Sequence, residues 1–177
     1  MRGRRPDCGA DAAALRELWQ AAGLLTRSTP FTPMTTTTLP VPSIFHFAFN
    51  VTDLDAARAF YGGALGCREG RSTATWVDFD FFGHQISMHL GEPFATAATG
   101  KVGSKMVPMP HFGIILLLPE WKALAERLQQ AGTDFVLAPQ VRFEGEPGEQ
   151  WTMFFRDPFG NPIEVKGFKT VEAICAA

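Results

Sequence analysis

The chain has 177 residues, of which 46% are hydrophobic and 19% charged, and its net charge at pH 7 is −2. This composition is typical of one soluble globular domain and excludes a disordered chain, a fibre or a large multidomain protein. Because no dense basic stripe follows residues 1–5, we expect no nucleic-acid binding. The longest apolar run ends at Pro119, far short of the roughly 20 residues that span a bilayer, so no membrane segment is predicted.

The start of the chain and the cysteines favour a cytoplasmic location. The basic first residues are followed by Pro6 and Asp7 rather than by an apolar stretch, so we predict no secretion signal. The three cysteines are scattered and lack CxxC spacing, which argues against a disulfide framework and against a zinc cluster.

Residues 1–42 differ in character from the rest of the chain. Residues 11–25 have the apolar spacing of a short amphipathic helix, and residues 26–42 are rich in Thr and Pro. We therefore predict an N-terminal extension and tether over 1–42, either poorly ordered or carrying one short helix.

The remainder contains a weak internal repeat. Residues 45–49 align with residues 110–114, and each segment leads into a helical pattern, over about 53–65 and 119–131 respectively. Each half then returns to strand-like sequence and ends on the related segments DFFGHQI and DPFGNPI. Each half therefore predicts one strand, one helix and three further strands.

The repeat predicts an α+β fold of two paired βαβββ modules that form a cupped mixed sheet with the helices outside. One module is too small to cover its own sheet, so the two have to pair. The predicted domain covers 43–169, and its parts are module 1 at about 43–92, a linker at 93–108 and module 2 at about 109–169, followed by a tail at 170–177.

Strand alternation places three polar side chains on the face away from the helices: His46, His111 and Glu164. Each histidine is followed two residues later by a very small residue, Ala48 or Gly113, which leaves space for a ligand. If the modules pair about a pseudo-twofold axis, the three side chains converge. Two imidazoles and one carboxylate on one side of a divalent ion form the facial arrangement of non-haem Fe(II) enzymes. The plainer alternative is a duplicated, hydrogen-bonded strand histidine without a metal.

The same alignment places Ser87 opposite Glu164. Serine is a poor ligand for such metals, so the asymmetry favours three protein ligands and an open coordination sphere.

With this repeat and triad, residues 43–169 resemble the vicinal oxygen chelate superfamily, which includes glyoxalases, fosfomycin resistance proteins and extradiol dioxygenases. The segments AFY at 59–61 with LG at 65–66, and DPFGNPIE at 157–164, resemble its signatures. The resemblance implies a divalent metal in the cup, held by His46, His111 and Glu164, that chelates two neighbouring oxygens of a small-molecule substrate.

The second half, around residues 141–151, looks most like small bacterial proteins related to extradiol dioxygenases. The resemblance therefore favours a homodimeric Fe(II) ring-cleaving enzyme for a catechol-like substrate, with Mn(II), Zn(II) or Ni(II) as alternative metals. Other activities implied by the family are a glyoxalase-like lyase or isomerase, a fosfomycin-type thiol transferase, and a metal-free binding protein similar to bleomycin resistance proteins. One departure is that the sole tyrosine, Tyr61, lies on the first predicted helix, whereas extradiol enzymes carry one on a strand of the metal module.

Four further residues are expected near the substrate. His89 shares strand parity with Ser87 and is the candidate for proton transfer. Ser87 and His84 are expected to border the substrate. Arg142, in a predicted long loop over 139–150, is expected to meet a substrate carboxylate. The sequence leaves open whether the cup closes within one chain or across a dimer.

Overall fold

The computed structural model of the protein describes residues 43–175. The predicted N-terminal extension, with its helix over 11–25, lies outside the described residues, as do the last two residues. The predicted first domain boundary therefore stays a prediction.

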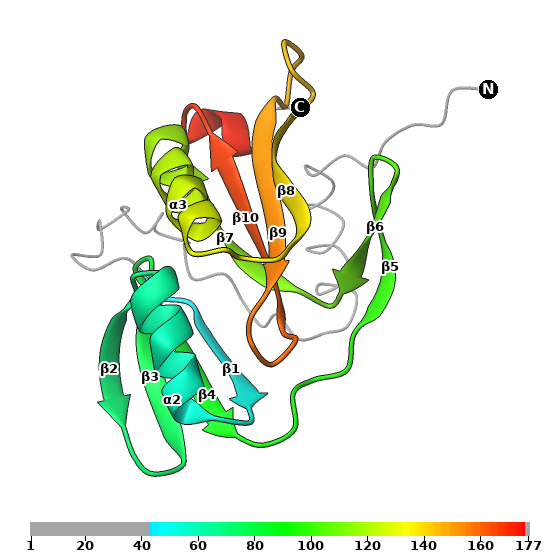
Figure 1. The fold of residues 1–177 in the computed structure, drawn as a ribbon. Coiled ribbons are helices and arrows are strands. Elements are labelled where there is room, and N and C mark those ends of the chain that lie inside the picture. The colour runs from blue at the N-terminus through cyan, green and yellow to red at the C-terminus, as the bar shows by residue number, and fades with distance from the viewer. Residues whose placement is uncertain (1–42, 176–177) are drawn as a thin grey trace, which may run out of the picture. The chain divides into compact units, whose positions relative to one another are not determined.

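The first βαβββ module forms one four-stranded sheet with a helix beside it (Figure 1). The Asp53 side chain caps the helix by accepting hydrogen bonds from the backbone N–H groups of Asp55 and Ala56, at 2.8 and 2.9 Å. Strand order is β1-β4-β3-β2, with β1 parallel to β4. The elements are β1 (His46–Val51), α2 (Leu54–Ala57), its π-helical continuation η1 (Arg58–Ala64), β2 (Arg68–Ser72), β3 (Trp76–Phe81) and β4 (His84–Leu90).

The second module repeats this order. Its helix has Pro119 in the first turn, where a missing N–H costs nothing. Strand order is β7-β10-β9-β8, with β7 parallel to β10. The elements are β7 (Phe112–Leu117), α3 (Leu118–Gln130), β8 (Phe135–Arg142), β9 (Gln150–Arg156) and β10 (Pro162–Phe168). The predicted α+β fold of two βαβββ modules is thus confirmed.

Two segments between elements differ from the sequence-based expectation. The linker predicted at 93–108 contains a hairpin of β5 (Ala97–Val102) and β6 (Lys105–Met109), because Val107 finds buried contacts with Leu137 and Phe154 on the second sheet. The long loop predicted at 139–150 shortens to 143–149, because β8 continues through Arg142. The tail also carries a 3-10 turn, η2 (Glu172–Cys175).

The strand registers of the two modules are equivalent. Ala48 on β1 pairs with Ser87 on β4, and Gly113 on β7 pairs with Glu164 on β10. These are the pairs that the internal repeat aligns. Ser87 and Glu164 therefore occupy matching positions on the faces of the sheets opposite the helices, which we call the open faces.

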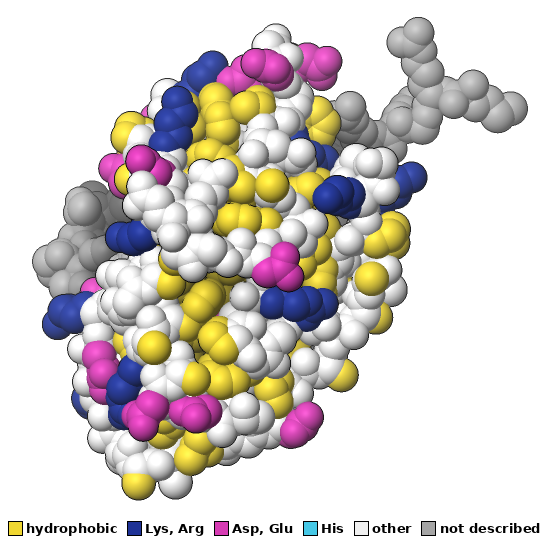
Figure 2. All heavy atoms as spheres, viewed as in Figure 1, with side chains coloured by type: hydrophobic (Ala, Val, Ile, Leu, Met, Phe, Trp, Pro, Cys, Tyr) yellow, Lys and Arg dark blue, Asp and Glu magenta, His cyan; other side chains and the backbone are white. Residues whose placement is uncertain are grey.

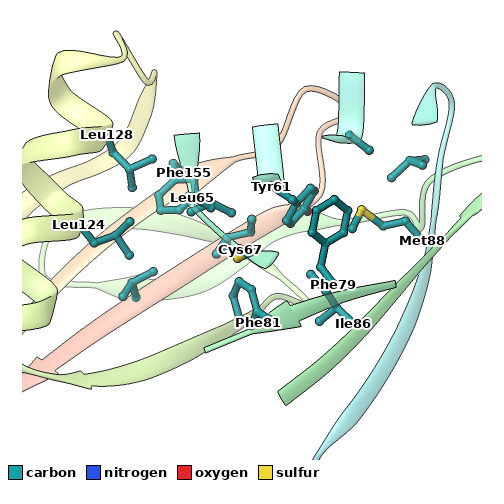
Figure 3. Close-up of a cluster of buried hydrophobic side chains, with 14 of the residues drawn as sticks. Tyr61, Leu65, Cys67, Phe79, Phe81, Ile86, Met88, Leu124, Leu128 and Phe155 are labelled. Atoms are coloured by element: carbon teal, nitrogen blue, oxygen red, sulfur yellow. The ribbon is translucent and has the colours of Figure 1, made fainter. Parts of the chain in front are cut away.

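One hydrophobic core lies between the two modules. Figure 3 shows Tyr61, Phe79 and Met88 of the first module in the same cluster as Leu124 and Phe155 of the second. The core faces of β1 and β7 also touch, since the rings of Phe47 and Phe49 lie 5.1 and 4.9 Å from the ring of Phe112.

A buried carboxylate joins the modules through hydrogen bonds. The Tyr61 hydroxyl donates to Asp157 Oδ2 at 2.9 Å, and the Asn161 side-chain amide donates to the same oxygen at 2.9 Å. The Asn161 amide also donates to the Asn50 carbonyl of β1 at 3.2 Å. Burial raises the pKa of Asp157, while these donors act in the opposite direction. The turn before β10 is thereby fixed to the first module.

Strands β7 and β10 approach unusually closely at Gly113. A Cβ atom at this position would lie 1.7 Å from the backbone oxygen of Glu164. Any residue with a side chain would push the two strands apart, so this glycine sets the distance between β7 and the strand that carries Glu164.

The first prediction concerns Tyr61, the only tyrosine of the chain. Burial, and then the nearby Asp157, raise the pKa of Tyr61 well above its usual 10. The folded state therefore favours the neutral phenol, whose contribution to stability is full below pH 10 and is lost as the pH rises above it. We expect absorbance at 295 nm to stay flat through pH 10 in the folded protein and to rise only at higher pH.

Protein unfolded in guanidinium chloride is the control, and its tyrosine should ionise near pH 10. In addition, Tyr61→Phe should lower the free energy of unfolding by about 1–3 kcal/mol, because the buried carboxylate loses a donor. A folded-state titration with its midpoint near pH 10 would contradict the buried placement.

Candidate functional site

His111 and Glu164 form a pair on the open face of the second sheet. His111 precedes β7, and its Nε2 atom lies 3.2 Å from Glu164 Oε2 on β10. Its Nδ1 atom lies 2.9 Å from the Pro108 carbonyl oxygen. A carbonyl can only accept, so Nδ1 carries the hydrogen, and in a neutral ring Nε2 then presents a lone pair to the carboxylate. In that neutral form, two electron-rich atoms face each other.

The Glu164 carboxylate is held from a second direction. The hydroxyl of Thr152, fully buried on β9, donates to Glu164 Oε1 at 3.0 Å. The ammonium of Lys166 lies 3.7 Å from Glu164 Oε2. Thr152 thus holds Oε1, whereas Oε2, the oxygen that faces His111, has no hydrogen-bond donor from Thr152 and lies near the Lys166 ammonium.

This arrangement fits a divalent metal ion. Metal-binding histidines usually donate their other ring N–H to a backbone carbonyl or carboxylate, as His111 does to Pro108. Ligand atoms that lie about 2.0–2.2 Å from one ion are about 3 Å apart when they are neighbours. The 3.2 Å between His111 Nε2 and Glu164 Oε2 matches that spacing, and both atoms have lone pairs to give.

His46, the third predicted ligand, lies on the open face of the other sheet. It is exposed at the start of β1 and pairs with Gln85 on β4. Among residues 43–175, no three His, Cys, Asp or Glu side chains lie close enough together to hold a metal ion. The structure of one chain thus brings together His111 and Glu164 without His46.

A cavity of about 510 Å³ opens beside the pair. His84, Phe45 and Lys166 line it together with His111 and Glu164. The Phe45 backbone N–H donates to His84 Nδ1 at 3.2 Å, so a neutral His84 carries its hydrogen on Nε2. His84, predicted from the sequence to border the substrate, shares a cavity with both metal-ligand candidates.

A second cavity, of about 520 Å³, is also lined by His111. Ala48 and Asn50 of β1 and His89 of β4 line it too, with Phe94 from the connecting segment. The ring of His89 lies 6.3 Å from the ring of Trp76. His89 therefore shares a cavity with His111 but not with Glu164.

The other two predicted substrate contacts lie elsewhere. Ser87 is buried, and its hydroxyl donates to Asp78 Oδ1 at 2.5 Å. Arg142 is at the end of β8 with its guanidinium 4.8 Å from the Phe143 ring. Neither residue lines the two cavities that contain His111.

Sequence reasoning missed Thr152 and Lys166. Lys166 follows Glu164 by two residues, so strand alternation alone could have placed it on the same face. Thr152 required the pairing of β9 with β10, which places it opposite Lys166 and next to Glu164.

The face of the molecule in Figure 2 carries charges of both signs. The face in Figure 2 shows acidic and basic side chains interspersed among hydrophobic ones. Within residues 43–175, no helix has the length and apolar character required to cross a membrane.

Comparisons with known proteins agree with this architecture. Residues 43–165 match the sequence profile of the Glyoxalase/Bleomycin resistance protein/Dioxygenase superfamily. No curated protein matches the chain. A glyoxalase/bleomycin resistance protein/dioxygenase from Alicyclobacillus acidocaldarius is similar in structure, with 30% identity, a TM-score of 0.60, and coverage of 75% of this chain and 96% of that one.

Two more distant structures share the fold. The fosfomycin resistance protein FosX from Listeria monocytogenes has 17% identity and a TM-score of 0.54, over 75% of this chain and 98% of its own. A lactoylglutathione lyase from Agrobacterium tumefaciens has 20% identity and a TM-score of 0.50, over 73% of this chain and 96% of its own. Given the match over most of its length and the shared pair of βαβββ modules, this chain belongs to the glyoxalase/bleomycin resistance protein/dioxygenase superfamily.

Proposed function

We propose that the protein is a metal-dependent enzyme acting on a small molecule with two neighbouring oxygens. The observation that carries the proposal is the His111 and Glu164 pair, in which an imidazole with a defined tautomer faces a carboxylate oxygen at 3.2 Å. A divalent ion held there acts as a Lewis acid that stabilises the anionic form of a chelating ligand.

We propose that His46 of a second copy of the chain supplies the third ligand. Within one chain, β1 and β7 contact each other through their core faces. This contact supports the view that the open faces of the two sheets do not meet in the monomer. Each strand forms an edge of its sheet, and a cavity of similar volume runs along each. Exposed apolar residues accompany these edges: Phe45 is 62% exposed, and Ile115 and Leu117 on β7 are each 41% exposed. Unpaired edges with exposed apolar side chains favour association.

For the reaction, we propose ring cleavage of a catechol-like substrate by an Fe(II) form of the protein. His46, His111 and Glu164 would hold Fe(II) as two histidines and one carboxylate, the ligand set typical of non-haem Fe(II) oxygenases. The apolar residues Phe45, Phe112 and Ile115 around the first cavity suit an aromatic ligand. His84 lines the same cavity and is a candidate hydrogen-bond donor to the ligand, and His89 is the candidate for moving a proton from the second cavity.

The other reactions of the superfamily can be distinguished from ring cleavage by whether oxygen is consumed. Tyr61 is buried against Asp157, so it takes no part in the site, and a cleavage reaction has to proceed without a tyrosine. A glyoxalase-like lyase or isomerase, or a fosfomycin-type thiol transferase, would also use the chelated metal but would not consume oxygen. The roles of Ser87 and Arg142 in substrate binding, and the cytoplasmic location, stay predictions.

The second prediction concerns metal binding. Isothermal titration of the purified protein with Mn²⁺ should show binding, and His111→Ala and Glu164→Gln should each weaken it at least about 100-fold, since residues that merely orient a ligand already contribute about 10 to 100-fold. Glu126→Gln, which changes an exposed carboxylate of α3 bonded to Gln130, is the matched control and should bind normally. A wild-type protein that takes up no Mn²⁺, Fe²⁺, Zn²⁺ or Ni²⁺ is a metal-free binding protein instead.

The third prediction concerns the shared site. His46→Ala and Glu164→Gln should each weaken metal binding at least about 100-fold on their own. The two variants refolded together should recover about a quarter of the sites at wild-type affinity, because half of the dimers are mixed and each mixed dimer holds one intact site. If size-exclusion and mass measurements show mixed dimers and no binding returns, His46 does not act across the interface.

The fourth prediction concerns the reaction. The protein loaded anaerobically with Fe²⁺ should consume oxygen on an electrode when a catechol is added, and the Glu164→Gln variant treated in the same way should not. No oxygen uptake across a panel of substituted catechols, with the metal shown to be bound, rules out ring cleavage and favours a lyase or transferase.

A further inference from the structure

Lys166 is a cation beside the proposed metal site. It lies outside the DPFGNPIE segment and is not one of the proposed metal ligands. It lies two residues after Glu164 on β10, so both side chains project from the open face. Its side chain is 36% exposed and lines the 510 Å³ cavity next to His111. Within the described part of the chain, its ammonium makes no hydrogen bond, and its one ion pair is with Glu164 at 3.7 Å. All three N–H donors are available to a ligand.

The Lys166 ammonium and a divalent ion require the same carboxylate oxygen. Oε2 of Glu164 is the atom that faces both His111 Nε2 and Lys166 Nζ, whereas Oε1 accepts the hydrogen bond from Thr152. A metal ion on Oε2 takes up the negative charge that attracts Lys166, and it repels the ammonium. The flexible Lys166 side chain can then turn into the cavity. Its neighbours there include the apolar residues Ile115 and Phe45, which cannot neutralise its charge.

We propose that Lys166 is an exchangeable cation that neutralises Glu164 in the metal-free protein and, once metal is bound, binds the negative charge of the ligand. The inference rests on the proposed metal site and names the ligand class: a small molecule that chelates through two neighbouring oxygens and binds as a dianion. The negative charge of Glu164 and the positive charge of Lys166 cancel. The net charge of the occupied site is therefore the +2 of the divalent ion, and a dianionic ligand neutralises it.

Replacing Lys166 should change the affinities for metal and for ligand in opposite directions. By isothermal titration, Lys166→Met should bind Mn²⁺ about twofold to fivefold more tightly than wild type, because a half-exposed competitor is removed. Loaded with Mn²⁺, it should bind oxalate at least about tenfold more weakly, because a charged hydrogen bond to the ligand is lost. Oxamate has the same chelating oxygens and one negative charge fewer, so its affinity should fall less.

Two controls separate charge from shape. Lys166→Arg keeps the positive charge and should retain oxalate affinity, and Lys122→Met removes an exposed lysine of α3 and should change neither titration. Unchanged Mn²⁺ and oxalate affinities in Lys166→Met overturn the proposal while leaving the metal site intact. Equal losses for oxalate and oxamate also overturn it. Failure of the wild-type protein to bind Mn²⁺ overturns the proposed function itself, and Lys166 with it.

Discussion

The position of the candidate site depends on the hydrogen bonds made by the buried Asp157 carboxylate. Burial raises the pKa of Asp157, and donors from both modules, Tyr61 from the first and Asn161 from the second, reduce the cost of its ionised form in part. Asn161 also reaches the Asn50 carbonyl on β1. Since Asp157 and Asn161 bound the turn that leads into β10, the same bonds that join the modules determine where β10, which carries Glu164, begins.

The two modules share one backbone plan but differ in how a carboxylate is used. In the second, Glu164 keeps an oxygen facing a histidine. In the first, the matching position is Ser87, and the nearby Asp78 accepts from Ser87, Gln85 and Arg71, so both of its oxygens are occupied. A carboxylate that already has all its partners gains little from a metal ion. The two halves therefore have the same strand register but differ in the hydrogen-bond partners of their carboxylates.

Much of this could be predicted from the sequence, because strand alternation and the internal repeat are local signals. They placed Glu164 on the open face and aligned Ser87 with it, as the paired registers confirm. The hairpin over 97–109 was missed, since its stability comes from Val107 contacting Leu137 and Phe154, far along the chain. The hydrogen bonds from Thr152 to Glu164 and from His111 to the Pro108 carbonyl likewise depend on tertiary placement that no local pattern encodes.

The placement of His46 ties chemistry to assembly in the proposed enzyme. A chain whose core faces pack together leaves its open faces to a second chain, so the metal site and the dimer interface become one surface. An ion bound by residues of two copies stabilises their association by mass action, and association in turn raises the affinity for the ion. Such a site would fill cooperatively with dimerisation. The monomer retains only His111 and Glu164 of the proposed ligand set, with the Lys166 ammonium 3.7 Å from the carboxylate.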